Sequence, residues 1–371
     1  MIDKHSRKIS YLRVSVTELC NLRCVYCMPP GGSELSDRDE ILSFEEILKI
    51  IKHGVSLGVN KIRLTGGEPL VRRDITSLIK QISDIEGIND IALTTNGVNL
   101  KEYAGALKES GLSRLNISLD TLKADRFSDI TRGGNIQDVF DGVEEILKVG
   151  FKGTKMNAVI MRDQNDDEIL DFVHYILERD IELRFIELMA SGWKNMVDAD
   201  RFMPSSEIME KVQEIGELVP VNERIGGGPA TIYKIKGALG SIGFISAVSK
   251  PFCSTCNRLR LTSDGKLRSC LLSGGEVDVK SLIRSSHLND EELTKYPNLL
   301  KQYYNSLGLS VARASSVASI INKNFRFPQK STIITGYGTR QPIKPNSTNS
   351  EKHLNSRIEI EVVRDKNIKK T

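Results

Sequence analysis

The chain has 371 residues, enough for two or three domains, and its 39% hydrophobic and 27% charged residues are typical of a globular protein. No apolar run approaches the ~20 residues of a membrane-spanning helix, so we expect no membrane association. A net charge of +4 is too small and too dispersed to indicate a nucleic-acid partner. The first residues, MIDKHSRKISYLRV, carry no apolar signal segment, and we therefore expect a cytoplasmic protein.

Short apolar segments alternate with helical periodicity over the first half of the chain. We expect strands at 11–16, 61–65, 90–95, 114–119, 155–161 and 183–188, with intervening helices that include 44–58, 75–85, 138–150 and 168–180. This alternation predicts βαβ units and a parallel sheet, hence an α/β protein. About six units are too few for a closed eight-stranded barrel, which favours a partial, open β/α barrel over a doubly wound sheet.

Polar residues follow the predicted strands, where ligands gather in sheets of this kind. A cysteine cluster follows the first strand, and the later strands are followed by TGGEP at 65–69, TTNG at 94–97, Ser118 with Asp120, and Glu187 with Met189. We expect these residues to meet around one mouth of the barrel.

The alternation stops near residue 205. A helix is expected over 206–216 and strands over 231–237 and 242–247, and a second cysteine cluster follows. We divide the chain into a partial barrel at 1–215, a second-cluster region at 216–284, a polar junction at 285–300 and a small α/β tail fragment at 301–371.

All the cysteines fall into two triplets with spacings C-x3-C-x2-C and C-x2-C-x13-C, namely Cys20, Cys24 and Cys27, and Cys253, Cys256 and Cys270. In a chain expected to be cytoplasmic, such clusters indicate metal binding rather than disulfides.

Zinc is the commonplace interpretation of a cysteine cluster, but structural zinc takes four ligands. Each triplet offers three, and the histidines lie in segments away from both, at His5, His53, His174, His287 and His353. Shared zinc that is held by all six thiols together stays open as an alternative. An iron–sulfur cluster held by three thiolates fits better, because one iron then remains open to a small molecule.

The C-x3-C-x2-C loop after the first strand, with Tyr26 just before its last cysteine, resembles the signature of radical S-adenosylmethionine enzymes, and TGGEP resembles their methionine-binding turn. Together with TTNG and the second triplet, residues of about 5–284 resemble the GTP 3′,8-cyclase family of molybdenum cofactor biosynthesis. The resemblance implies two [4Fe-4S] clusters as cofactors, with open irons that face one another, and S-adenosylmethionine bound at the first cluster.

The resemblance also assigns roles to individual positions. The S-adenosylmethionine site would include Tyr26, Gly67, Ser118 and Met189. The GTP site would include Arg13, Arg63, Thr94, Lys155, Arg258, Leu259 and Arg260. The implied reaction is hydrogen abstraction from the 3′ carbon of the ribose, followed by attack on carbon 8 of guanine. It needs no general acid or base, and we name none.

Partners follow from the same resemblance. They are GTP, a low-potential electron donor and a downstream pyranopterin-forming enzyme, and we add a homodimer as a possible assembly. The first alternative is a radical S-adenosylmethionine enzyme that acts on another substrate, with an auxiliary second cluster.

The C-terminal segment departs from the family. Family members end in a Gly-Gly tail, whereas this sequence ends at Thr371 in a Lys-rich stretch, so a catalytically impaired fusion is a second alternative. Segments 309–321, 336–346 and 355–362 resemble half of an outer-membrane-protein-A-like domain, in which Arg313 matches a peptidoglycan-binding arginine. A peptidoglycan-binding protein is therefore the non-enzyme alternative, although the partner aspartate of that arginine is missing.

Overall fold

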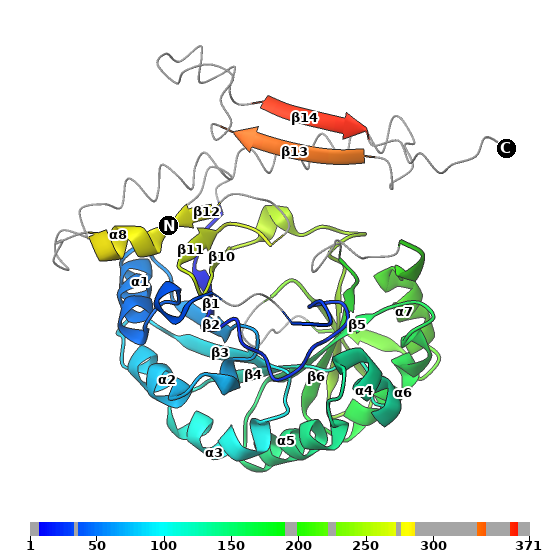
Figure 1. Cartoon of the computed structure of the whole chain (residues 1–371). Coiled ribbons are helices and arrows are strands. Elements are labelled where there is room, and N and C mark those ends of the chain that lie inside the picture. Colours follow the sequence, from blue (N-terminus) through cyan, green and yellow to red (C-terminus); the bar gives the residue numbers. More distant parts are fainter. Residues whose placement is uncertain are drawn as a thin grey trace.

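The computed structural model describes residues 7–32, 36–189, 199–221, 228–271, 276–285, 332–338 and 357–362. Within them, twelve strands form one sheet in the order β12-β11-β10-β1-β2-β3-β4-β5-β6-β9-β8-β7. Helices cover the outer side of its curved central part (Figure 1). The predicted open β/α barrel is confirmed.

The six predicted βα units are present and in chain order. Their strands are β1 (Tyr11–Ser15), β2 (Lys61–Thr65), β3 (Asp90–Thr95), β4 (Arg114–Ser118), β5 (Thr154–Ile160) and β6 (Ile181–Glu187). Each is parallel to the next. The helices are α1 (Phe44–Ser56), α2 (Ile75–Ser83), α3 (Leu100–Glu109), α4 (Ala124–Thr131), α5 (Ile136–Lys148) and α6 (Ile169–Leu177). Predicted and observed ends differ by a few residues.

Local sequence explains these elements. Helix α1 starts at a capping box, in which the Ser43 hydroxyl accepts from the backbone N–H of Glu46 and the Glu46 carboxylate accepts from that of Ser43. Along β1, Leu12 and Val14 are buried in the core beneath the helices, whereas Arg13 points to the opposite, inner face of the sheet. The same alternation in the other strands separates an apolar outer face from a polar inner face.

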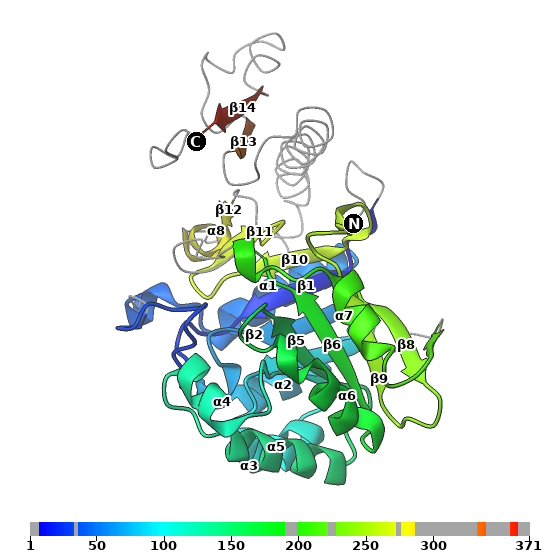
Figure 2. The same cartoon turned by 90° about the vertical axis from the view of Figure 1, so that its right-hand side faces the viewer.

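The second-cluster region extends both edges of this sheet. After α7 (Ser205–Val212) come β7 (Leu218–Pro220), β8 (Thr231–Ile235) and β9 (Ser241–Ile245), which joins β6 in parallel. The chain then crosses to the other edge, where β10 (Arg258–Leu261) joins β1 in parallel, followed by β11 (Lys266–Arg268), β12 (Glu276–Asp278) and α8 (Val279–Ser285). Figure 2 shows β10 beside β1, with β8 and β9 beyond β6. The sheet is thus continuous across the domain boundary predicted at residue 215.

Short 3-10 helices complete the described chain, namely η1 (Arg38–Glu40), η2 (Pro69–Val71), η3 (Asp166–Glu168), η5 (Ala199–Arg201) and η6 (Cys253–Thr255). Among the described residues, no helix combines the length and the apolar character that crossing a bilayer requires.

In the C-terminal segment, β13 (Thr332–Gly338) and β14 (Arg357–Val362) form a two-stranded antiparallel sheet. The rest of the predicted tail fragment, including Arg313, lies outside the described residues, as does most of the junction at 285–300. The peptidoglycan-binding resemblance therefore receives no support from the structure.

Candidate functional site

The first cysteine triplet lies in the loop that follows β1, at the carboxyl ends of the parallel strands. Cys20 and Cys24 are partly buried and Cys27 is exposed. The N–H groups of Cys27 and Met28 both donate to the carbonyl of Cys24, at 3.0 and 3.1 Å, which closes a tight turn between the last two cysteines. Burial raises the pKa of all three thiols, that of Cys24 to about 12, with the neighbouring Asp120 and the other two thiols as further causes for Cys24.

The TGGEP turn packs directly against this loop. The backbone N–H of Gly67 donates to the carbonyl of Thr17 at 2.8 Å, and that of Glu68 donates to the carbonyl of Leu19 at 2.7 Å. A Cβ atom on Gly67 would lie only 2.2 Å from the oxygen of Leu19. Glycine is therefore required at this predicted cofactor position by the close approach of two backbones.

Glu68 fastens the TGGEP turn to the TTNG segment. Its buried carboxylate accepts from the hydroxyl of Thr95 at 2.8 Å and from the backbone N–H of Asn96 at 2.7 Å. The amide of Asn96 in turn donates to Asn21 at 2.8 Å and lies 3.9 Å from the sulfur of Cys20. The loops after β1, β2 and β3 thus form one hydrogen-bonded unit, as the sequence predicts for a common mouth.

Tyr26 is held by Asp120, which lies just past the end of β4. The phenol donates to Oδ2 of Asp120, whose Oδ1 accepts from the backbone N–H of Val159 at 2.8 Å. Burial and the adjacent carboxylate raise the pKa of Tyr26 well above its ordinary value, so the phenol stays protonated. The other two predicted cofactor residues also lie at this end of the sheet, with Ser118 exposed at the end of β4 and Met189 half-buried shortly after β6.

The second triplet lies at the opposite, amino end of the parallel strands. Cys253 and Cys256 precede β10, and Cys270 follows β11, which runs back along β10. This segment is tied to the chain just before β1, because Arg7 donates to the carbonyl of Cys253 at 2.6 Å and the amide of Asn257 donates to the hydroxyl of Ser10 at 3.2 Å. The two triplets are therefore separated by the length of β1 and β10, on the order of 15 Å.

Four arginines line the inner face between the two triplets. Arg13 of β1 lies opposite Arg63 of β2 on one side and Arg260 of β10 on the other, and Arg258 lies opposite Tyr11. Burial lowers the pKa of Arg13 well below its ordinary value, and the charges of Arg260 and Arg63 lower it further. Among the described residues, none of the four forms an ion pair with a carboxylate. Within the part of the chain that the structure describes, this group of cations therefore has no carboxylate counter-charge.

A second part of the inner face carries Thr94, Lys155 and their neighbours. Lys155 is fully buried, and its ammonium lies 3.5 Å from the carboxylate of Glu182. Burial, followed by the charge of Arg184, lowers the pKa of Lys155 to about 7, although Glu182 acts in the opposite direction. Lys155 is thus poised to gain a proton when an anion approaches.

The structure separates one predicted residue from the others. The side chain of Leu259 is 5% exposed and lies in the apolar core, on the face of β10 opposite Arg258 and Arg260. Its side chain is therefore not on the inner face, because neighbouring residues of a strand point to opposite sides.

Sequence reasoning missed two buried arginines on the inner face. Arg114 of β4 forms a two-pronged ion pair with Asp90, and Arg184 of β6 pairs with Glu182. In the sequence they cannot be told apart from Arg13, since each is an arginine within an apolar strand. Asp90, the partner of Arg114, lies on another strand, and Glu182, the partner of Arg184, lies two residues before it. The one signal in the sequence for their place on the inner face is the alternation of side-chain direction along a strand, seen at LRF (183–185) and SRL (113–115).

The six cysteines have the donor chemistry of iron–sulfur ligands, because thiolates hold such clusters. None of the six forms a disulfide, and within each triplet the charges of the thiols influence one another. Among the residues that the structure describes, no three Cys, His, Asp or Glu side chains gather closely enough for one metal ion.

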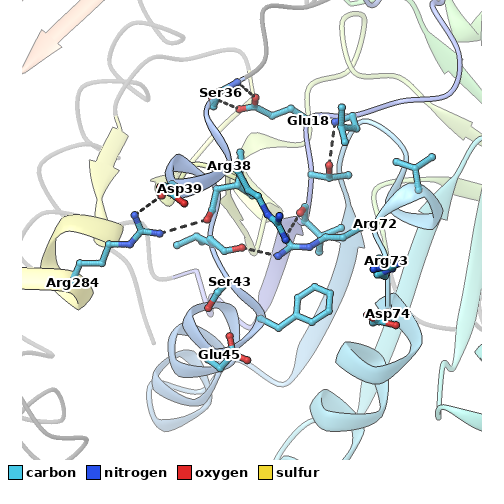
Figure 3. A pocket seen from close by; sticks show the side chains of 17 residues that line it. Glu18, Ser36, Arg38, Asp39, Ser43, Glu45, Arg72, Arg73, Asp74 and Arg284 are labelled. Carbon is cyan, nitrogen blue, oxygen red and sulfur yellow. Dashed lines mark hydrogen bonds between the residues drawn. The ribbon is translucent and has the colours of Figure 1, made fainter.

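A separate cavity of about 990 Å³ is lined by the segment that follows β1, by the start of α1 and by residues 71–74 (Figure 3). In it, Arg72 donates to the carbonyl of Leu42 at 2.7 Å and stacks on Phe44, while Glu18 accepts from Ser36 at 3.0 Å. None of the predicted site residues lines it. Arg72 and Glu18 already have these partners, and the described residues that line the cavity include neither a cysteine triplet nor the four arginines of the inner face.

Comparisons with known proteins agree with this geometry. Residues 14–176 match the family model "Radical SAM superfamily", and residues 181–302 match "Molybdenum Cofactor Synthesis C". The chain is 48% identical over 285 residues to a GTP 3′,8-cyclase of Pelotomaculum thermopropionicum, which covers 76% of this chain and 88% of that protein. It is 51% identical over 286 residues to a GTP 3′,8-cyclase of Clostridium botulinum (strain Langeland), with 77% and 88% covered.

Among solved structures, Streptococcus suis SuiB has a similar fold, with a TM-score of 0.54 at 15% identity over 84% of this chain and 69% of that one. The family models end at residue 302, and the resemblance of the C-terminal segment to an outer-membrane-protein-A-like domain finds no support among them. With both halves of the sheet matched and close to half of the residues identical to curated relatives, the chain belongs to the GTP 3′,8-cyclase family of the radical SAM superfamily.

Proposed function

We propose that this protein catalyses the cyclisation of GTP to 3′,8-cyclo-7,8-dihydro-GTP, the first step of molybdenum cofactor biosynthesis, with S-adenosylmethionine and two [4Fe-4S] clusters as cofactors. The observation that carries the proposal is the group of four arginines, Arg13, Arg63, Arg258 and Arg260, which lacks a carboxylate partner among the described residues and lies between the two cysteine triplets. A triphosphate, with about four negative charges, suits guanidinium groups of this kind.

At the carboxyl end of the sheet, Cys20, Cys24 and Cys27 would hold the first cluster and S-adenosylmethionine. When bound, these groups supply the 5′-deoxyadenosyl radical that removes hydrogen from the 3′ carbon of the ribose. The chain contributes the rigid unit around them. Gly67 and Glu68 fix the TGGEP turn against the cysteine loop, and Asp120 holds the phenol of Tyr26 in one orientation.

At the amino end, Cys253, Cys256 and Cys270 would hold the second cluster next to the guanine. Arg258 and Arg260 follow this triplet on β10 and pair in register with Tyr11 and Arg13, so their charges would lie between the base end of the substrate and its phosphates. Lys155 lies farther along the inner face and would become fully protonated beside the phosphates, since an adjacent anion raises the pKa of an ammonium group.

The partners follow from this chemistry. The reaction needs a low-potential electron donor, and its product needs a downstream pyranopterin-forming enzyme. We expect the protein to work in the cytoplasm, where thiols stay reduced and available for cluster assembly. A homodimer stays part of the proposal.

The test is an anaerobic reaction of the cluster-loaded protein with S-adenosylmethionine, GTP and a strong reductant. Mass spectrometry should find 5′-deoxyadenosine and cyclised GTP in comparable amounts. Deoxyadenosine without a cyclised nucleotide would favour another substrate or an impaired fusion, and neither product from fully loaded protein would overturn the proposal.

Two matched cysteine variants test whether the first triplet serves radical formation and the second serves cyclisation of GTP. Cys24→Ala removes a ligand of the first triplet and should abolish deoxyadenosine formation. Cys253→Ala removes a ligand of the second and should abolish cyclised GTP while deoxyadenosine is still formed. If both variants lost both products equally, at equal loading of the intact cluster, the division of roles would be wrong.

A further inference from the structure

Asn116, in the middle of β4, is a fully buried polar residue that the predicted site does not include. Its side chain is 0% exposed, yet among the residues that the structure describes neither Nδ2 nor Oδ1 has a hydrogen-bond partner. A buried amide without partners is costly, and native proteins rarely leave one unless water or a ligand completes it. Asn116 therefore indicates a binding function.

The strand register places Asn116 on the inner face of the sheet. Its neighbours in β4, Leu115 and Ile117, lie in the apolar core under the helices, so Asn116 points the other way, together with Arg114 and Ser118. It lies directly opposite Thr94 of β3 on one side and Lys155 of β5 on the other. Both of these are predicted substrate contacts, and the hydroxyl of Thr94 also lacks a partner among the described residues.

Two cations lie near Asn116, and the carboxylates that pair with them, Asp90 and Glu182, lie on strands β3 and β6. Lys155 is beside it in the same row, and Arg114 is two residues before it on the same strand. A further cation here would add to the repulsion among these groups. A neutral amide can instead donate a hydrogen bond to an anion without adding charge.

We propose that Asn116 binds the triphosphate of the substrate, with its amide N–H donating to a phosphate oxygen between Thr94 and Lys155. This inference rests on the proposed function, and it adds a specificity-determining residue. The amide would help the protein to distinguish a nucleoside triphosphate from a nucleoside, because only the triphosphate completes its hydrogen bonds.

Equilibrium binding to the cluster-loaded protein under anaerobic conditions tests the proposal, with GTP and guanosine as the two probes. Asn116→Ala should weaken GTP about tenfold and leave guanosine unchanged, as expected for the loss of one hydrogen bond to a charged group. Asn116→Asp should weaken GTP further, by about 100-fold, because a carboxylate would repel the phosphates.

Asn116→Leu separates binding from folding. Leucine has a similar size and needs no hydrogen bond, so the melting temperature of the ligand-free protein should stay the same or rise, while the increase caused by GTP becomes smaller. The matched control is Thr154→Val. Thr154 is also fully buried with an unpartnered hydroxyl among the described residues, but it lies on β5 next to Lys155 and faces the other side of the sheet. It should not change GTP binding.

Several outcomes would overturn the proposal. One is an equal loss of GTP and guanosine affinity in Asn116→Ala, which would place the amide on the nucleoside part. Others are tighter or unchanged GTP binding in Asn116→Asp, or a lower melting temperature with unchanged GTP binding in Asn116→Leu, which would make the residue structural. Failure of the unaltered protein to bind GTP at all would instead contradict the proposed function, so the two failures can be distinguished.

Discussion

The inner face of the sheet has two sides that differ in whether their cations form ion pairs. On the side of β10, β1 and β2, Arg258, Arg260, Arg13 and Arg63 lie next to one another with no carboxylate partner among the described residues. On the side of β4, β5 and β6, the cations are paired, Arg114 with Asp90, and both Arg184 and Lys155 with Glu182.

This difference separates two kinds of cation on the inner face, those with a carboxylate partner and those without one. An ion pair inside the protein compensates its own charge and helps to fix the strands that carry it. Adjacent arginines without a partner repel one another, and the pKa of Arg13 is lowered first by burial and then by the charges of Arg260 and Arg63. The unpaired side is therefore prepared for an anion from outside, whereas the paired side combines structural support with a titratable lysine.

The largest effect should come from breaking a pair. Arg114→Leu would leave the carboxylate of Asp90 buried without its partner, which costs about 3–5 kcal/mol. Chemical denaturation of the variant should show a loss of stability of this size, and adding Asp90→Asn should recover much of it. An Arg114→Leu protein as stable as the parent would contradict the division into paired and unpaired sides.

The counterpart on the unpaired side is Arg13→Leu. We expect no loss of stability, since the change removes repulsion from Arg63 and Arg260, but a decrease of GTP affinity of roughly 30-fold, as expected for a lost charge-assisted contact. Chemical denaturation measures the stability of this variant, and a titration with GTP measures its affinity. Destabilisation by several kcal/mol with unchanged GTP binding would make Arg13 structural.

The third prediction concerns pH and Lys155. The pKa of Lys155 is about 7 in the folded protein, below its ordinary value of 10.5, so the unfolded chain binds the proton more tightly. Stability of the ligand-free protein should therefore rise with pH from about 7 towards 10.5, and this contribution should vanish in Lys155→Met.

GTP affinity should change in the opposite direction, because the triphosphate prefers the protonated lysine. It should fall about tenfold between pH 7 and 8.5, with proton uptake measurable by titration calorimetry in two buffers of different ionisation enthalpy. In Lys155→Arg, whose charge does not titrate, the dependence should flatten. Equal slopes in the two proteins would assign the titration to another group.

The smallest effect is expected for Tyr26→Phe, in the first cysteine loop, which lies outside both the paired and the unpaired side of the inner face. The change removes the hydrogen bond to Asp120, worth about 1 kcal/mol, and leaves the bond from Val159 in place. Binding of S-adenosylmethionine should weaken a few-fold while GTP affinity stays constant. A large loss of GTP binding would contradict this expectation, because it would mean that Tyr26, at the carboxyl end of the sheet, also supports the binding of GTP on the inner face.

The sequence was sufficient for the features that depend on neighbouring residues. Period-2 strands and helical stretches in alternation predicted β1 to β6, and the cysteine spacing together with TGGEP predicted the mouth at their carboxyl ends. These signals are local, and the rule that parallel strands end at one edge supplies the rest.

Features that depend on register across distant strands were not predicted. Arg13 and Arg260 lie opposite each other although 247 residues separate them, and nothing in either segment specifies that pairing. The position of the second triplet at the amino ends, the burial of Leu259 in the core, and the unpartnered amide of Asn116 depend on the same long-range pairings.

The most direct test of hydrogen abstraction from GTP follows the deuterium atom of a labelled substrate. The cluster-loaded protein would react anaerobically with S-adenosylmethionine and GTP that carries deuterium on the 3′ carbon of the ribose. We predict that one deuterium appears in each 5′-deoxyadenosine molecule and that cyclised GTP forms in comparable amounts. Deoxyadenosine that is formed without deuterium would contradict the account, because the radical would then be taking hydrogen from somewhere other than the 3′ position of GTP.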